Sequence, residues 1–162
     1  EGRAITLPDN GRERAESVVR KHRLAERLLT DVIGLPWSQS HLEACRWEHV
    51  ISDQVEERLV ALLGNPTTCP HGNPIPGTAG SNVSQIPLSD LEVGSKAKVT
   101  RVTERIEIDT DSLAYLDAAN LRPGADASVT AKAPDGTLTI EVDGVPVSLG
   151  ASLTSQIFVD AS

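Results

Sequence analysis

Residues 41–49 read His41-Leu-Glu-Ala-Cys45-Arg-Trp-Glu48-His49. At about 100° per residue, a helix here places four polar side chains on one stripe, those of His41, Cys45, Glu48 and His49. Ala44 and Trp47 share a different, apolar face. Histidine, cysteine and glutamate are ordinary metal ligands. The stretch predicts a helix that carries metal; the alternative is a polar helix face with one buried cysteine.

One metal ion cannot use the whole stretch. A rise of about 1.5 Å per residue separates His41 from His49 by roughly 12 Å along the helix axis. Bonds from zinc to its ligands are only about 2.0–2.3 Å long. Any metal here therefore occupies two places. Cys45, Glu48 and His49 could serve one ion, and His41 needs partners from another segment.

Composition fits a folded protein of one medium domain or two small ones. The 162 residues are 39% hydrophobic and 23% charged, and only 2% are aromatic. The scarcity of aromatic rings argues against a platform that stacks single-stranded nucleic acid. The net charge is −8, of which residues 1–64 carry −2 and residues 65–162 carry −6. Such a chain repels a phosphate backbone, so any DNA contact is expected elsewhere.

The chain has two cysteines, Cys45 and Cys69. Without a signal peptide, reduced thiols are the favoured state, and a disulfide between the two is the competing interpretation. No apolar run approaches the roughly 18 residues of a membrane span. We therefore expect a cytoplasmic protein with no membrane contact.

The segment before the ligand stretch reads as a long helix over residues 11–33. Ala25, Leu29 and Ile33 mark one face, and the helix is expected to end at Gly34. His22 and Glu26 lie one turn apart on this helix. With His41 they would form a site of nitrogen and oxygen ligands.

Two shorter helices follow. Ser40 with Glu43 three residues later resembles a capping box, which predicts a helix that begins at about His41. Ser52 is expected to cap a third helix that ends at Gly64. These helices have more apolar surface than the segment can cover. That surplus suggests a dimer, although a missing domain could cover the same surface.

Residues 65–87 are rich in proline and read as an ordered loop and a linker. Cys69 and His71 are two residues apart, but no second pair stands at the spacing of a zinc site. From Leu88 onward, short alternating runs and the turn Asp143-Gly144 predict a small β-barrel of about five strands. The chain is thus an α+β protein, with a helical domain at 8–77, a linker at 78–87 and a barrel at 88–162.

Three runs carry a resemblance to a known family. They are Arg20-Lys-His-Arg-Leu-Ala-Glu-Arg-Leu-Leu29, the ligand stretch through Val50, and Asn65-Pro-Thr-Thr-Cys-Pro-His-Gly-Asn-Pro-Ile-Pro-Gly77. Together they resemble the iron-dependent repressors of the diphtheria toxin repressor family. The resemblance implies a helical dimerisation and metal-binding domain followed by a barrel similar to SH3 and to the ferrous transport protein FeoA. It also implies a preceding winged-helix DNA-binding domain, of which residues 1–7 would be the remnant of the wing.

The resemblance assigns roles by position. Cys45, Glu48 and His49 match a primary, regulatory metal site whose remaining ligand in the family is a methionine. His22, Glu26, His41, Glu104 and Glu107 match an ancillary metal site. Arg23 and Asn73 match residues that hold an anion beside it, although Cys69 replaces the usual serine there. Glu107 replaces a common glutamine. The chain has no methionine, so its primary site has an open position.

The predicted function is metal sensing and dimerisation in a ferrous-iron-dependent transcriptional repressor that controls iron homeostasis. The expected cofactor is Fe2+, with Zn2+, Co2+ or Ni2+ able to substitute. The expected partners are a second copy of the chain and operator DNA, the DNA only through the N-terminal domain. We do not expect the protein to be an enzyme. The rivals are a metallohydrolase that uses Glu48 beside an open metal position, and a metal-binding adaptor.

Overall fold

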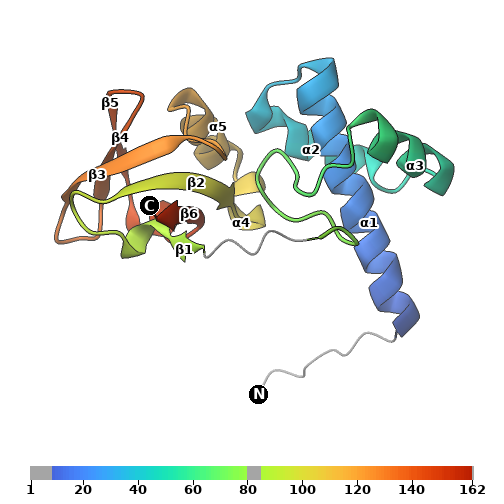
Figure 1. The fold of residues 1–162 in the computed structure, drawn as a ribbon, viewed down its shortest axis with the longest axis horizontal. Coiled ribbons are helices and arrows are strands. Elements are labelled where there is room, and N and C mark those ends of the chain that lie inside the picture. The colour runs from blue at the N-terminus through green and yellow to red at the C-terminus, as the bar shows by residue number, and fades with distance from the viewer. Residues whose placement is uncertain (1–8, 80–84, 162) are drawn as a thin grey trace.

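A computed structural model describes residues 9–79 and 85–161 of the protein. Helices form the first half and an antiparallel sheet with short helices forms the second (Figure 1). The expected wing remnant, residues 1–7, lies outside the described residues. The helices of the first half are α1 (Asp9–Arg27), the π-helical turn η1 (Leu28–Ile33), α2 (Trp37–Trp47) and α3 (Asp53–Leu62).

The first helix follows the sequence pattern up to its end. α1 passes into η1, and Gly34 terminates it in the left-handed conformation at φ 79°, which favours glycine. Ala25 and Leu29 are buried as expected. Ile33, at 56% exposure, is not. The predicted apolar face therefore continues onto the surface at the end of this helix.

The second helix begins earlier than the predicted capping box. α2 starts at Trp37, and the buried Ser40 hydroxyl donates to the Trp37 carbonyl at 3.0 Å. The Trp37 side chain is 3% exposed, and its indole nitrogen donates to the Pro70 carbonyl at 3.0 Å. This tertiary anchor fixes the first turn, which local capping could not predict. Ser52, in contrast, caps α3 as expected by accepting from the Val55 amide.

The second half is a six-stranded antiparallel sheet in the order β1-β6-β2-β3-β4-β5. The strands are β1 (Ile86–Pro87), β2 (Lys96–Val102), β3 (Asp126–Lys132), β4 (Leu138–Val142), β5 (Val145–Leu149) and β6 (Ile157–Ala161). Short helices punctuate them: η2 (Leu88–Asp90), α4 (Glu104–Glu107), α5 (Thr110–Ala118) and α6 (Ala151–Thr154). Asp143 and Gly144 both take positive φ in the β4–β5 turn, as the sequence predicts. The architecture is α+β with an SH3-like second half.

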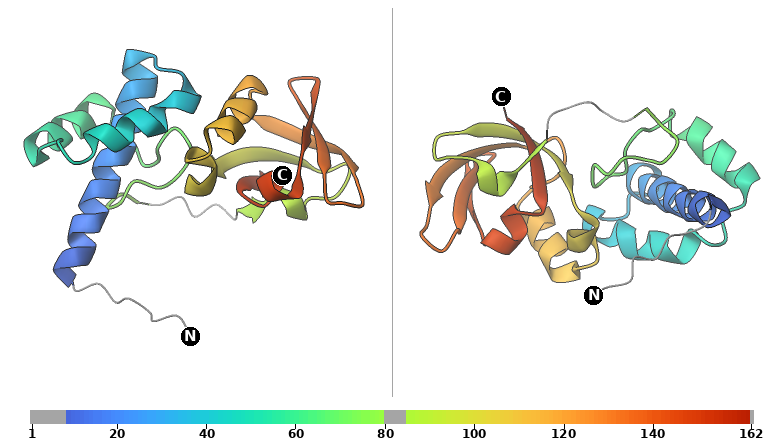
Figure 2. Two further views of the ribbon diagram at one scale, coloured as in Figure 1. Left: turned by 180° about the vertical axis from the view of Figure 1, so that it is seen from behind. Right: turned by 90° about the horizontal axis from the view of Figure 1, so that it is seen from below.

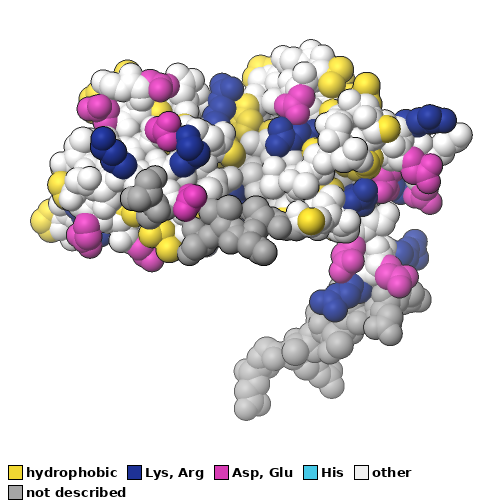
Figure 3. Space-filling model, in the orientation of Figure 1, with side chains coloured by type: hydrophobic (Ala, Val, Ile, Leu, Met, Phe, Trp, Pro, Cys, Tyr) yellow, Lys and Arg dark blue, Asp and Glu magenta, His cyan; other side chains and the backbone are white. Residues whose placement is uncertain are grey.

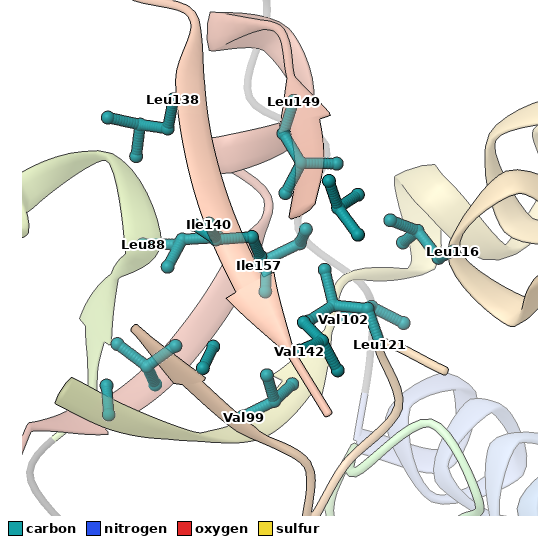
Figure 4. Packing of buried hydrophobic residues seen from close by; sticks show 14 of the residues in the cluster. Leu88, Val99, Val102, Leu116, Leu121, Leu138, Ile140, Val142, Leu149 and Ile157 are labelled. Atoms are coloured by element: carbon teal, nitrogen blue, oxygen red, sulfur yellow. The ribbon is translucent and has the colours of Figure 1, made fainter. Parts of the chain in front are cut away.

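The main hydrophobic core lies inside this sheet (Figure 4). Aliphatic side chains from the strands and from α5 point toward one another, among them Val99, Ile140 and Leu116. Trp37 of α2 belongs to the same cluster. The two halves of the protein therefore share a core residue, and the views in Figure 2 place α4 and α5 at their boundary.

The proline-rich loop also joins the halves. The His71 carbonyl accepts from the Val102 amide at 2.9 Å, and the Asn73 side chain donates to the Val102 carbonyl at 2.8 Å. Gly72 lies between them at φ 85°. A Cβ atom there would overlap the Thr100 carbonyl oxygen and lie 2.7 Å from the Arg101 Cα. Glycine permits this close approach of two backbones.

None of the helices in the described ranges has the length and hydropathy that crossing a membrane requires.

Candidate metal centre

Three helices bring four potential ligands together at the boundary between the halves. His22 and Glu26 project from successive turns of α1, His41 comes from α2, and Glu107 comes from α4. All four are buried, with exposures of 8%, 0%, 7% and 2% in that order. On the face shown in Figure 3, no histidine of the described residues is visible at the surface.

The donor atoms of this cluster lie close enough to share one ion. Glu26 Oε1 is 3.0 Å from His22 Nε2 and 3.0 Å from His41 Nδ1. The two ring nitrogens are 3.1 Å apart, and His41 Nδ1 lies 2.9 Å from Glu107 Oε2. Ligands bonded at about 2.0–2.2 Å to one ion are separated by such distances. We call His22, Glu26, His41 and Glu107 the four-residue cluster.

In the metal-free protein, hydrogen bonds between the histidine rings and the carboxylates stabilise this cluster. Burial disfavours the charged form of His41, but hydrogen bonds to Glu107 and Glu26 and their negative charge outweigh it and raise the pKa to about 9. Burial also disfavours the charged form of His22, but the hydrogen bonds to Glu26 and Glu48 and the charge of Glu26 outweigh it and raise the pKa. Burial opposes ionisation of Glu26, yet bonds to His22, His41 and His71 hold its pKa well below the ordinary value. A bound cation would replace these protons.

The predicted primary-site residues lie on the outer side of His22 and His41. Cys45 Sγ is 3.8 Å from His41 Nε2. Glu48 Oε2 lies 2.7 Å from His22 Nδ1, and Glu48 Oε1 lies 3.1 Å from the Nε2 of His49, which is 68% exposed. α2 ends at Trp47, with Glu48 as its C-cap. The expected helical stripe therefore stops before His49, and the three side chains do not converge on one point.

Two other predicted residues form an ion pair with each other, and one of them, Glu104, also lines a hollow together with His22 and His41. Arg23 donates to Glu104 Oε1 at 2.6 Å and to the Pro74 carbonyl. The Glu104 side chain is 63% exposed. Asn73, in contrast, is buried and donates to Glu107 Oε1 at 2.5 Å. The structure thus places Asn73 beside the four-residue cluster, whereas Arg23 and Glu104 form an ion pair with each other.

The sequence pattern did not assign His71 to this site. Its side chain is fully buried, and Nδ1 lies 3.3 Å from Glu26 Oε1. Cys69, 1% exposed, belongs to the same surroundings, and both cysteines are free thiols. The only sequence feature that pointed to His71 was its spacing of two residues from Cys69. The local sequence contains no further ligand for this pair, because the neighbouring carboxylate, Glu26, comes from α1.

Two family models match the two halves of the chain. Residues 9–77 match the family model "Iron dependent repressor, metal binding and dimerisation domain", and residues 86–161 match the FeoA domain. The chain is 46% identical over 153 residues to the iron-dependent repressor IdeR of Mycobacterium tuberculosis, covering 88% of this chain and 66% of that protein. It is 37% identical over 167 residues to the diphtheria toxin repressor of Corynebacterium diphtheriae, covering 98% of this chain and 73% of that one.

The chain belongs to the diphtheria toxin repressor family. A solved structure titled "Manganese-dependent transcriptional repressor complex with manganese" superposes with a TM-score of 0.84 at 32% identity, covering 98% of this chain and 76% of that chain. The family consists of transcriptional repressors rather than enzymes, so the metallohydrolase and adaptor interpretations lose their support. The chain spans slightly less than two thirds of the mycobacterial relative.

The side chains of the four-residue cluster are suitable ligands for a divalent metal ion. Nitrogen and carboxylate donors suit iron, zinc and related metals. One buried atom of the cluster, Glu26 Oε2, has no hydrogen-bond partner among the described residues. A buried polar atom without a partner costs about 1–3 kcal/mol, which a bound cation would remove.

Proposed function

We propose that the protein is the metal-sensing and dimerisation part of a ferrous-iron-dependent DNA-binding transcriptional repressor that controls iron homeostasis. The observation that carries the proposal is the four-residue cluster. It draws ligands from α1, α2 and α4, and so from both halves of the protein. An ion held there ties the halves in one arrangement. A ligand that binds one arrangement better than another shifts the population toward it.

His22 couples this cluster to the proposed regulatory ligands. Its Nε2 faces Glu26 and His41, while its Nδ1 faces Glu48. We assign Cys45, Glu48 and His49 to a primary site that is completed when a further ligand approaches. His22, Glu26, His41 and Glu107, with Glu104 as a further carboxylate, form the ancillary site. A metal ion in the ancillary site would fix the imidazole ring of His22. Because that ring also bonds to Glu48, the ion would position a ligand of the primary site.

Ferrous iron is the proposed activating ion. The thiol of Cys45 favours softer divalent ions over manganese. The mycobacterial relative at 46% identity is named for iron, whereas the solved relative at 32% identity is named for manganese. Zn2+, Co2+ and Ni2+ are expected to substitute in vitro.

A second copy of the chain is the proposed partner at the surface formed by η1 and α2. A hollow of about 630 Å³ lies there, with Ile33, Leu42 and Trp47 in its lining. Val32, Ile33 and Leu42 are 56%, 56% and 47% exposed beside it. The matched family model describes a dimerisation domain over these residues. Apolar surface of this kind supports a symmetric interface between protomers.

Operator DNA is the proposed target, reached through an N-terminal winged-helix segment. The net charge of −8 repels phosphate. The described half that carries the sheet is the more acidic, so it is not the proposed DNA contact. Arg23, a proposed anion ligand with Asn73, donates to Glu104 at 2.6 Å and is not a proposed DNA contact.

Anaerobic titration of the whole repressor with Fe2+, read by binding to operator DNA, tests the proposal. Operator affinity is expected to rise at least tenfold with iron, and His41→Ala is expected to abolish the rise. Asp126→Asn, at an exposed ion pair with Lys98 on the sheet, is the matched control and should respond like the parent. Operator binding that does not change with metal would overturn the proposal.

A further inference from the structure

The described start of α2, the helix that carries His41, lacks a side-chain cap from its own sequence. Its N-cap position is Pro36, which forms no side-chain hydrogen bond, and no acidic residue lies in the first turn of this helix. The first amide groups of a helix have no partner within the helix and need an acceptor from elsewhere. Because His41 lies one turn beyond Trp37, the contacts that hold the first turn also set the position of a proposed metal ligand.

The acceptor comes from the other half of the protein. Asp117 lies near the end of α5, and its Oδ2 accepts a hydrogen bond from the Ser38 amide at 3.2 Å. The Asp117 side chain is 13% exposed. α5 lies beside α2 in both views of Figure 2. Asp117 therefore has the chemical role of an N-cap residue, although it is 79 residues away from Ser38 in the sequence.

The Asp117 carboxylate is also held from its other side. Arg122 Nη2 lies 2.5 Å from Asp117 Oδ1, and the Arg122 guanidinium stands 5.9 Å from the centre of the Trp37 ring. A guanidinium at this distance over an aromatic face is attracted by the ring. Trp37 in turn donates to the Pro70 carbonyl. The first turn of α2 is thus fixed by a carboxylate, a cation and a loop carbonyl.

The segment that supplies Asp117 also supplies a proposed metal ligand. α4 ends at Glu107, and α5 begins at Thr110. Glu107 Oε2 lies 2.9 Å from His41 Nδ1, while Asp117 bonds to Ser38, three residues earlier on α2. The sheet half therefore contacts α2 at two points, one in the four-residue cluster and one at Asp117. An ion in the cluster and the Asp117 hydrogen bond favour the same position of α2, so each is expected to strengthen the other.

We propose that Asp117 is a positioning residue for metal binding: from the sheet half it caps α2 and holds His41 where Glu26 and Glu107 can share an ion with it. The inference rests on the proposed function, because it takes the four-residue cluster as the metal centre. Coupling between two binding events is reciprocal. A bound ion should therefore slow hydrogen exchange of the Ser38 amide, and loss of Asp117 should weaken binding of the ion.

Two variants at one position separate the cap from its charge. Asp117→Ala removes the acceptor, whereas Asp117→Asn keeps an oxygen for the Ser38 amide, and asparagine ranks with aspartate as an N-cap residue. In competition with a chelator, Asp117→Ala is expected to weaken Zn2+ binding by about five- to tenfold, and Asp117→Asn by less than about twofold. Asp135→Ala is the matched control, because Asp135 accepts from the Thr137 amide within the sheet half. This variant should bind zinc like the parent.

Hydrogen exchange at the Ser38 amide, measured by NMR, tests the contact itself. In the parent chain, zinc is expected to slow this exchange. In Asp117→Ala, the amide should exchange like an unprotected one with or without zinc. Exchange that zinc leaves unchanged in the parent would overturn the inference, and this measurement decides the matter even if Asp117→Ala does not fold.

The outcomes separate the role of Asp117 from the proposed function. If His41→Ala loses zinc affinity and Asp117→Ala keeps it, the positioning role fails and the metal centre stands. If neither variant changes zinc affinity, both fail. Equal losses of zinc affinity in Asp117→Ala and Asp135→Ala would show a general effect of stability and would also overturn the positioning role.

Discussion

At the scale of single residues, His41 links metal binding to pH. Its pKa is raised from 6.5 to about 9 in the metal-free protein. The raised value means that protonated His41 stabilises the fold fully below pH 6.5, and that this contribution is lost as the pH rises through about 9. A difference of this size corresponds to on the order of 3 kcal/mol. Chemical denaturation of the metal-free protein is expected to show falling stability between pH 6.5 and 9.

Metal affinity is expected to change in the opposite direction. An ion must displace the His41 proton, so the affinity of Zn2+ should increase by up to about tenfold per pH unit below pH 9. Calorimetric titration at several pH values measures this. His41→Ala should weaken both trends, and His22, whose pKa is also raised, accounts for the part that remains. Equal zinc affinity at pH 6.5 and 8.5 in the parent would contradict the assignment of His41 as a ligand.

Glu107 allows a charge to be removed while the shape is kept. The side chain is 2% exposed, lies 2.9 Å from His41 Nδ1 and accepts from Asn73. Glu107→Gln is expected to reduce zinc affinity by about 10–100-fold, the range found when groups around a metal site are altered. Competition with a chelator measures the loss. Glu141→Gln, exposed on β4, is the control, and a similar loss there would show that the effect is general electrostatics.

At the scale of elements, the close approach of the loop to β2 depends on Gly72. Both Gly72 and Gly94 take positive φ, at 85° and 90°, but only Gly72 has backbone where a Cβ would be. Gly94→Ala is expected to cost about 1 kcal/mol from backbone strain alone. Gly72→Ala should cost about 2–4 kcal/mol, because overlap with the Thr100 carbonyl adds to the strain. Urea denaturation of the two variants measures the difference, and equal losses would refute the close approach.

The same elements show how far the sequence could predict the structure. Hydrophobic periodicity and turn residues predicted the long first helix, the Ser52 cap and the Asp143-Gly144 hairpin, since each depends on local chemistry. The start of α2 was predicted wrongly because Trp37 is fixed by Pro70 and the sheet core. His71 was not assigned for the same reason. Its partners come from α1 and α4, and no local pattern relates a loop histidine to carboxylates 45 and 36 residues away.

At the scale of the whole molecule, the proposed metal ligands lie at the boundary of the two halves, where one ion would contact both. The sheet has a large core of its own, while the helical half is held by two small clusters, around Leu24 and around Ala25. Because the helical half buries little hydrophobic core, contacts with the sheet are expected to contribute a large share of its stability. Trp37, the loop at Gly72 and the four-residue cluster all tie the helices to the sheet, so metal binding and domain packing stabilise the same arrangement.

The helical half is the proposed site of pairing with a second copy of the chain. Leu42 is 47% exposed at the apolar hollow formed by η1 and α2, whereas Val145 is 60% exposed on the sheet. In a symmetric dimer, Leu42→Glu places one unpaired carboxylate from each protomer in the same apolar interface. The dissociation constant of the dimer is therefore expected to rise at least 100-fold. Val145→Glu should leave it unchanged. Sedimentation velocity over a range of concentrations measures both, and a dimer that survives Leu42→Glu but not Val145→Glu would move the interface to the sheet.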